Sequence, residues 1–158
     1  MIYLQKKNFN FGQEVKKIIA DNHQIGAVVS FLGLVRDMAT NPQLISMVIE
    51  HYPGMTEKKI TEIEAYAIQN WKLSKSLIIH RYGILHPGEQ IVLVVAAAEH
   101  RHTAFEACQF IIDWLKTDAP FWKLEITNKT KNWVKVQKQD LQKRDTWLSL
   151  SNAKTVKN

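Results

Sequence analysis

An unbroken apolar run at residues 91–98, IVLVVAAA, constrains the fold more than any other stretch of the chain. A run of strand length without polar alternation predicts a β-strand that is buried on both faces. The run ends abruptly in four polar residues, Glu99, His100, Arg101 and His102. A charged corner at the exit of a buried strand is a common location for a functional site.

The residues after this corner predict a helix over 103–116, with Thr103 as N-cap and Glu106 completing a capping box. Apolar residues recur there at helical spacing and predict the buried face: Phe105, Cys108, Ile111, Ile112 and Leu115. Pro120 prevents further helix. Beyond it, an alternation of period two predicts a strand with Lys123 and Glu125 on one face.

The rest of the chain predicts an α+β fold with a mixed or antiparallel sheet. Asn10 and Thr56 each start a predicted helix, and further strands are predicted at residues 1–7, 27–35, 44–51, 77–82 and 133–136. The strand at 27–35 is apolar and β-branched, which favours a central position, and Gly33 within it indicates a bulge. We expect one domain over residues 1–144 and a loosely held basic tail over 145–158.

Composition narrows the class of partner and the compartment. The formal charge of +6 favours anionic partners, which include nucleic acid, acidic proteins and phosphorylated small molecules. The single cysteine, Cys108, excludes a disulfide framework and lies on the predicted buried stripe, so we expect a core residue. No apolar stretch has the length of a membrane span and the start lacks a secretory signal, so we predict a cytoplasmic protein.

Five basic residues are candidates for a site. Lys116 and Lys123 flank a chain reversal that can bring two ammonium groups together, and a lysine beside other cations loses its proton more readily. The alternative for Lys116 is a plain helix-dipole contact worth roughly 0.3–1 kcal/mol. Arg36, His100 and Arg101 follow predicted strands, and those strand ends could converge into an anion pocket. The alternative is that each is an exposed loop residue.

A metal site is not predicted. His100 and His102 could share an ion, but zinc requires three or four ligands at a recognisable spacing, and the other His and Cys residues do not supply them. No phosphate-binding glycine loop or dinucleotide-binding fingerprint is present, and no cofactor is expected.

Seven short blocks of sequence together resemble the large, catalytic subunit of molybdopterin synthase. In chain order they are FLGLVR at 31–36, EHYPGM at 50–55, HRYG at 80–83, PGE at 87–89, HR at 100–101, FEA at 105–107 and KTxAPFWKxE at 116–125. The resemblance implies an α/β hammerhead fold with an additional small antiparallel β subdomain, and it implies that the protein is a sulfurtransferase. That enzyme converts cyclic pyranopterin monophosphate to molybdopterin, the dithiolene ligand of the molybdenum cofactor.

The resemblance also implies partners and roles. It implies a homodimer within a heterotetramer, in which a small ubiquitin-like carrier delivers sulfur on its C-terminal Gly-Gly thiocarboxylate. By position, Lys116 and Lys123 are the implied catalytic residues. The implied substrate-binding residues are Arg36, His100, Arg101, Glu125, Val35 and Leu34. Leu34 stands where some relatives carry a polar residue, and an arginine expected near Gln137 is missing.

The alternative function is that of a small basic α+β module that binds nucleic acid. No RNA- or DNA-binding signature is present and the lysines are dispersed along the chain, which disfavours that function.

Overall fold

The computed structural model describes residues 1–37 and 43–155, with side chains described up to residue 149. Its strands form two sheets. The first sheet contains, in spatial order, β1 (Ile2–Gln5), β4 (Lys75–Arg81), β6 (Gln90–Ala98) and β2 (Ala27–Leu34). The second contains β5 (Gly83–Leu85), β3 (Leu44–His51), β7 (Phe121–Thr127) and β8 (Lys131–Trp133). The helices are α1 (Phe11–Ile19), α2 (Met55–Trp71), α3 (Arg101–Thr117) and α4 (Lys138–Thr155).

The first sheet is mixed, as predicted for an α+β fold. β1 runs parallel to β4, whereas β4 and β2 are both antiparallel to β6. β6 is central and its residues from Leu93 to Ala98 are buried, which confirms the buried strand expected from the apolar run. The prediction that residues 27–35 form a central strand is wrong, because β2 lies at the sheet edge. The bulge expected at Gly33 is present as a register shift between Gly33 and Leu34.

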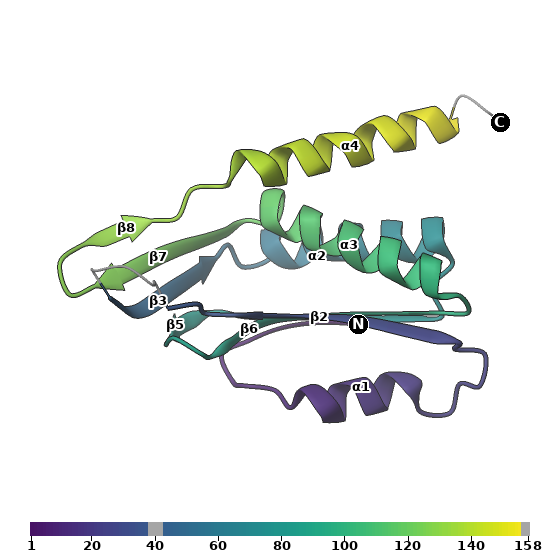
Figure 1. Ribbon diagram of the computed structural model, residues 1–158, viewed down its shortest axis with the longest axis horizontal. Helices are drawn as coiled ribbons and strands as arrows, with labels where there is room; N and C mark the ends of the chain where they lie inside the picture. Colours follow the sequence, from purple (N-terminus) through teal and green to yellow (C-terminus); the bar gives the residue numbers. More distant parts are fainter. Residues whose placement is uncertain (38–42, 156–158) are drawn as a thin grey trace.

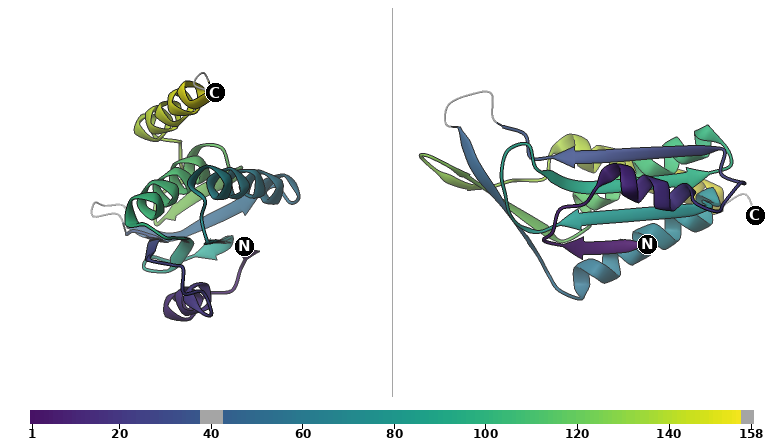
Figure 2. Two further views of the ribbon diagram at one scale, coloured as in Figure 1. Left: turned by 90° about the vertical axis from the view of Figure 1, so that its right-hand side faces the viewer. Right: turned by 90° about the horizontal axis from the view of Figure 1, so that it is seen from below.

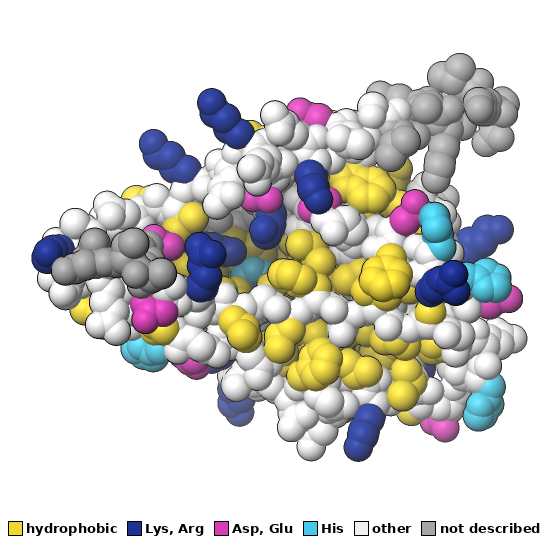
Figure 3. Space-filling model, viewed as in Figure 1, with side chains coloured by type: hydrophobic (Ala, Val, Ile, Leu, Met, Phe, Trp, Pro, Cys, Tyr) yellow, Lys and Arg dark blue, Asp and Glu magenta, His cyan; other side chains and the backbone are white. Residues whose placement is uncertain are grey.

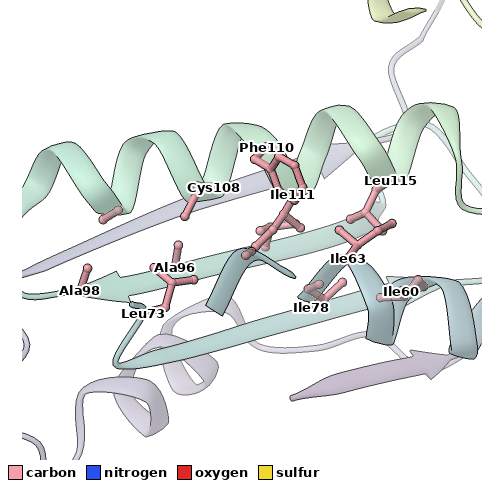
Figure 4. Packing of buried hydrophobic residues seen from close by; sticks show 14 of the residues in the cluster. Ile60, Ile63, Leu73, Ile78, Ala96, Ala98, Cys108, Phe110, Ile111 and Leu115 are labelled. Atoms are coloured by element: carbon pink, nitrogen blue, oxygen red, sulfur yellow. The ribbon is translucent and has the colours of Figure 1, made fainter. Parts of the chain in front are cut away.

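Helices cover both faces of the first sheet. Figure 1 shows α1 on one face, α2 and α3 on the other, and α4 outside α3; the two views in Figure 2 agree. The larger core lies between the sheet and the α2–α3 layer, where Ile63, Ile78 and Ile111 meet (Figure 4). A smaller core around Ile18 and Leu93 lies under α1.

The predicted N-cap residue is correct for α1 and wrong for α3. The N–H of Gln13 donates to Oδ1 of Asn10 at 2.9 Å, so Asn10 caps α1 as predicted. Thr103 was expected to cap α3, but the helix begins at Arg101, directly after the strand exit, and its N-cap residue is His100. Phe105, expected on the buried face, is 62% exposed.

The second sheet extends away from the first. β3 pairs with both β5 and β7 in antiparallel register, and β7 pairs with β8. Gly83, with a φ of 92°, allows the sharp turn from β4 into β5, a strand that the sequence analysis did not predict. β7 contains Lys123 and Glu125, as the period-two alternation predicted.

Residues 145–155 continue α4 instead of forming the loose tail expected from composition, while residues 156–158 lie outside the described part. The indole Nε1 of Trp147 donates to Oδ2 of Asp113 at 2.9 Å, and Arg144 pairs with Asp118 at 3.4 Å. These contacts attach α4 to α3. Within the described ranges, no helix is long and apolar enough to cross a membrane.

Candidate active site

A cavity of about 650 Å³ opens where the first sheet meets the end of α3 and the start of β7. Three cationic side chains line it: Arg36, Lys116 and Lys123. The rest of the wall is mainly apolar and comes from β2, β6 and α3. Figure 3 shows this face of the molecule, with Lys and Arg side chains beside a band of hydrophobic ones. The cavity can therefore hold an anion next to an apolar ring or chain.

The two lysines meet because the chain reverses between them. Lys116 lies in the last turn of α3, and Lys123 is the third residue of β7. The turn is tied down by hydrogen bonds, with the Thr56 hydroxyl donating to the carbonyl of Pro120 at 3.2 Å. The bend therefore places both lysines in the lining of one cavity, where the charge of Lys116 acts on Lys123.

The lysines have different surroundings. Lys116 is half exposed, and its Nζ lies 3.7 Å from Oδ1 of Asp140 on α4. Lys123 is more buried, and burial lowers its pKa below the ordinary value. The charge of Lys116 lowers the pKa of Lys123 further, while Asp140 opposes that effect. Lys123 thus loses its proton more readily than an ordinary exposed lysine.

His80 on β4 also lines the cavity, although the sequence analysis did not name it as a site residue. Its side chain is buried, and the pKa of its imidazole falls to about 3, chiefly through burial and then through the charge of Lys123. The one sequence feature that could have identified His80 as a cavity residue is its place in the HRYG block at 80–83. Burial beside two lysines depends on tertiary structure, which a local pattern does not report.

The other predicted substrate-binding residues on these strands have different positions. Leu34 lies in the cavity wall and is half exposed. Val35 is 1% exposed, because it packs in the core of the second sheet with Ile49 and Leu85, so its side chain does not line the cavity. Glu125 lies two residues beyond Lys123 on β7 and does not line the cavity either.

His100 and Arg101 are not brought to this cavity within one chain. They lie at the start of α3, and Lys116 at its end, about 24 Å apart along a helix that rises about 1.5 Å per residue. β2 and β6 are antiparallel, with Ala27 opposite Ala98 and Leu34 opposite Gln90. The exits of these two strands therefore lie at opposite ends of the sheet, and the expected convergence of Arg36 with the His100–Arg101 corner does not occur in a single copy.

Cys108 is a core residue, as predicted. It is 3% exposed among apolar neighbours on α3, and burial raises the pKa of its thiol to about 12. Such a thiol remains protonated near neutral pH and is a poor nucleophile.

A larger cavity, of about 830 Å³, lies between α1 and the first sheet. Two of its charged side chains, Lys17 and Glu14, pair with each other at 2.7 Å. Its other two cationic groups also have partners: the Met1 ammonium group pairs with Glu64, and Nζ of Lys75 donates to the carbonyl of Ala20 at 3.1 Å.

Comparison with known proteins identifies the family. A family model described as MoaE protein matches residues 4–118. The chain belongs to the MoaE family. The molybdopterin synthase catalytic subunit of Ralstonia nicotianae is 46% identical over 146 residues, which cover 92% of this chain and 83% of that protein.

Solved structures of MoaE proteins have the same fold. The molybdopterin biosynthesis MoaE protein from Burkholderia ambifaria matches with a TM-score of 0.79 at 41% identity, covering 93% of this chain and 97% of the other. A chain in the complex of subunits 1 and 2 of the molybdopterin-converting factor from Helicobacter pylori matches with a TM-score of 0.71, covering 85% and 90%. At 18% identity, the second match shows the fold alone.

Proposed function

We propose that this chain is the catalytic subunit of a molybdopterin synthase, a cytoplasmic sulfurtransferase that converts cyclic pyranopterin monophosphate to molybdopterin. The observation that carries the proposal is the convergence of Arg36, Lys116 and Lys123 on one apolar-walled cavity, in a chain of the MoaE family. The substrate combines a phosphate with a flat heterocycle. Guanidinium and ammonium groups match the phosphate, and the apolar wall matches the ring.

The sulfur is proposed to arrive on a partner. A sulfurtransferase that used its own thiol would need an exposed cysteine of lowered pKa, whereas Cys108 is buried with a raised one. A small ubiquitin-like carrier with a C-terminal Gly-Gly thiocarboxylate supplies the sulfur instead. Its extended, anionic tail fits a cavity with cations at its end, and the Helicobacter pylori complex of two subunits is a precedent for such an assembly.

Each sulfur transfer replaces one C–O bond of the pterin side chain with a C–S bond. The thiocarboxylate sulfur attacks carbon, the oxygen leaves with a proton, and water then cleaves the acyl–sulfur bond to release the carrier as a carboxylate. Lys116 supplies the proton and stabilises the developing negative charge, and Lys123, with its lowered pKa, assists. Arg36 holds the phosphate. Glu125, which the resemblance implies to be a substrate-binding residue, is joined to Lys123 by no hydrogen bond or ion pair among the described residues.

The proposed assembly is a homodimer, with a carrier on each catalytic chain. β2 is an edge strand, and the exposed apolar residues Phe31, Leu34 and Phe105 lie on it and on the adjoining helix α3. Unpaired strand edges with apolar neighbours favour association. A twofold axis near the middle of β2 would set the two edges antiparallel and bring the start of one β2 beside the end of the other.

That arrangement would complete the site. The start of β2 lies against the His100 corner, since a Cβ on Gly26 would come within 2.2 Å of the carbonyl oxygen of Glu99. In the dimer, His100 and Arg101 of one copy would therefore approach Arg36 and the lysines of the other. We propose that these two residues bind phosphate and pterin across the interface.

The decisive experiment measures molybdopterin formation from cyclic pyranopterin monophosphate and a preformed thiocarboxylated carrier. We expect Lys116→Ala to lower the rate at least about 100-fold, the usual scale for loss of a general acid. Lys58→Ala is the matched control, because Lys58 is an exposed lysine on α2, remote from the cavity lining. Activity of Lys116→Ala near that of the control would remove Lys116 from the mechanism. Steeply salt-dependent oligonucleotide binding without carrier binding would favour the nucleic-acid-binding alternative.

A further inference from the structure

His80 is a buried histidine in the wall of the cavity, and the reaction proposed above does not use it. It follows Ile78 by two residues on β4, so both side chains point to the face covered by α2 and α3. The imidazole stacks on the ring of Phe121, with the centroids 3.7 Å apart and the planes 12° from parallel. Phe121 precedes Lys123 by two residues on β7, so these two side chains share one face of that strand. The stack therefore fixes the imidazole next to Lys123.

The hydrogen bonding of the ring defines its tautomer. Nδ1 of His80 lies 2.8 Å from the carbonyl oxygen of Arg81. A carbonyl oxygen only accepts, so Nδ1 carries the hydrogen. In the neutral ring the lone pair is then on Nε2, and burial together with the charge of Lys123 keeps the ring neutral at physiological pH. Among the described residues, Nε2 has no hydrogen-bond donor.

Lys123, the lysine next to this ring, lacks a hydrogen-bond acceptor among the described residues. Lys123 is half-buried, yet within the described part of the chain its ammonium group has no hydrogen-bond or ion-pair partner. An ammonium group that is withdrawn from water requires an acceptor. The other cations of the cavity, Arg36 and Lys116, only donate. The carboxylate of Asp140, which raises the pKa of Lys123 from a distance, pairs with Lys116. An unpaired donor and an unpaired acceptor thus line the same cavity, close enough for the charge of Lys123 to act on the imidazole, and no hydrogen bond joins them in this conformation.

We propose that His80 is a positioning residue for Lys123: rotation of the flexible lysine side chain brings Nζ to Nε2 of His80, which accepts its hydrogen bond and holds the ammonium group at the cavity wall. The catalytic consequence rests on the function proposed above, whereas the hydrogen bond itself does not. An acceptor favours the charged form of the lysine, so it partly offsets the effect of burial. When substrate or carrier enters, Lys123 exchanges this neutral acceptor for an anionic one.

The test measures the pKa of the Lys123 ammonium group by nitrogen-15 NMR in the full chain, in the wild type and in two variants. His80→Phe keeps an aromatic ring against Phe121 but removes the acceptor. His80→Gln restores an acceptor near the position of Nε2. The groups that also act on this titration are Lys116 on α3, Asp140 on α4, Arg36 after β2 and His51 on β3, and all of them are unchanged in both variants.

We expect His80→Phe to lower the pKa of Lys123 by roughly one unit, the scale of one hydrogen bond to a charged group, and His80→Gln to restore most of it. The lysine-dependent limb of the pH–rate profile should move to lower pH in the Phe variant alone. An unchanged Lys123 pKa in a folded Phe variant would overturn the proposal, as would a shift that Gln does not reverse.

If the Phe variant fails to fold, nitrogen-15 NMR of the His80 ring in the wild-type protein tests the proposal instead. A hydrogen on Nδ1, together with a hydrogen-bond coupling between Nε2 and the Lys123 ammonium group, would support the proposal. A hydrogen on Nε2 would overturn it. A wild-type protein that shows this coupling but makes no molybdopterin would overturn the proposed function and not the hydrogen bond.

Discussion

Oδ1 of Asp140 lies 3.7 Å from Nζ of Lys116, and this contact connects the C-terminal helix α4 to the candidate active site. Asp140 belongs to the first turn of α4, and Trp147, two turns later, attaches the same helix to Asp113 of α3. The helix therefore supplies a counter-charge beside a cavity whose charged lining residues are all cationic. Since Lys116 is half exposed, the ion pair contributes little stability, and the main effect of the Asp140 carboxylate is on the pKa of Lys123, which it raises.

Replacing Asp140 with Asn should lower the pKa of Lys123. The Asp140 carboxylate raises that pKa, so its removal leaves burial and the Lys116 charge unopposed. Nitrogen-15 NMR of the lysine Nζ groups measures the shift directly. Asp145→Asn is the control, because Asp145 pairs with Arg144 and not with a lysine of the cavity. An equal or higher Lys123 pKa in Asp140→Asn would contradict the electrostatic role of α4.

Two inactive variants should complement each other if the site is shared between copies. Lys116→Ala and Arg101→Ala alter groups at opposite ends of α3. In a mixed dimer one site would carry both substitutions and the other site neither. Random pairing of equal amounts makes about half of the dimers mixed, so about a quarter of wild-type activity should return. The measurement is molybdopterin formation after the two chains are unfolded and refolded together.

Lys116→Ala mixed with Lys123→Ala is the matched control, because both lysines line the same cavity of one copy. Every site of that mixed dimer carries one lesion, and no activity should return. Equal recovery in the two mixtures, or none in either, would show that His100 and Arg101 do not act across an interface.

Cys108 should be unreactive in the folded protein and dispensable for catalysis. The raised pKa of about 12 keeps the thiol protonated at pH 7–9, and burial blocks access of reagents such as disulfide dyes. We expect labelling only after unfolding. Cys108→Ala should retain sulfur transfer while losing about 1 kcal/mol or more of stability from the vacated volume. Loss of activity in a folded Cys108→Ala protein, with the carrier supplied as thiocarboxylate, would implicate the thiol.

Local patterns predicted most of the elements, because burial of a face imposes its period on the sequence. The apolar run at 91–98 and the alternation around Lys123 both correspond to strands of the structure. The position of β2 in the sheet was misjudged for a physical reason. Val28 and Val29 face the two separate cores, so the strand is apolar on both sides although its edge is unpaired. The burial of a strand's two faces determines how apolar its sequence is. Its position in the sheet depends instead on which strands pair with it, and those are distant in the chain.

The site was predictable only where its residues are close in the chain. Lys116 and Lys123 are joined by one short turn, and the sequence predicted their meeting. Arg36 and His100 follow different strands, and their separation depends on the antiparallel register of β2 and β6, which no local pattern contains. The α4 helix was missed because its surface is polar and few of its side chains, such as Trp147, reach the core.

The stacked rings of His80 and Phe121 have a consequence for how damage to this protein would appear. His80 belongs to the first sheet and Phe121 to the second, so the stacked rings connect the two sheets directly. We expect a substitution that loosens β7 to move Lys123 away from Lys116 and Arg36 in the cavity before it unfolds the chain. Substitutions in the second sheet should therefore lower the catalytic rate while the protein remains folded.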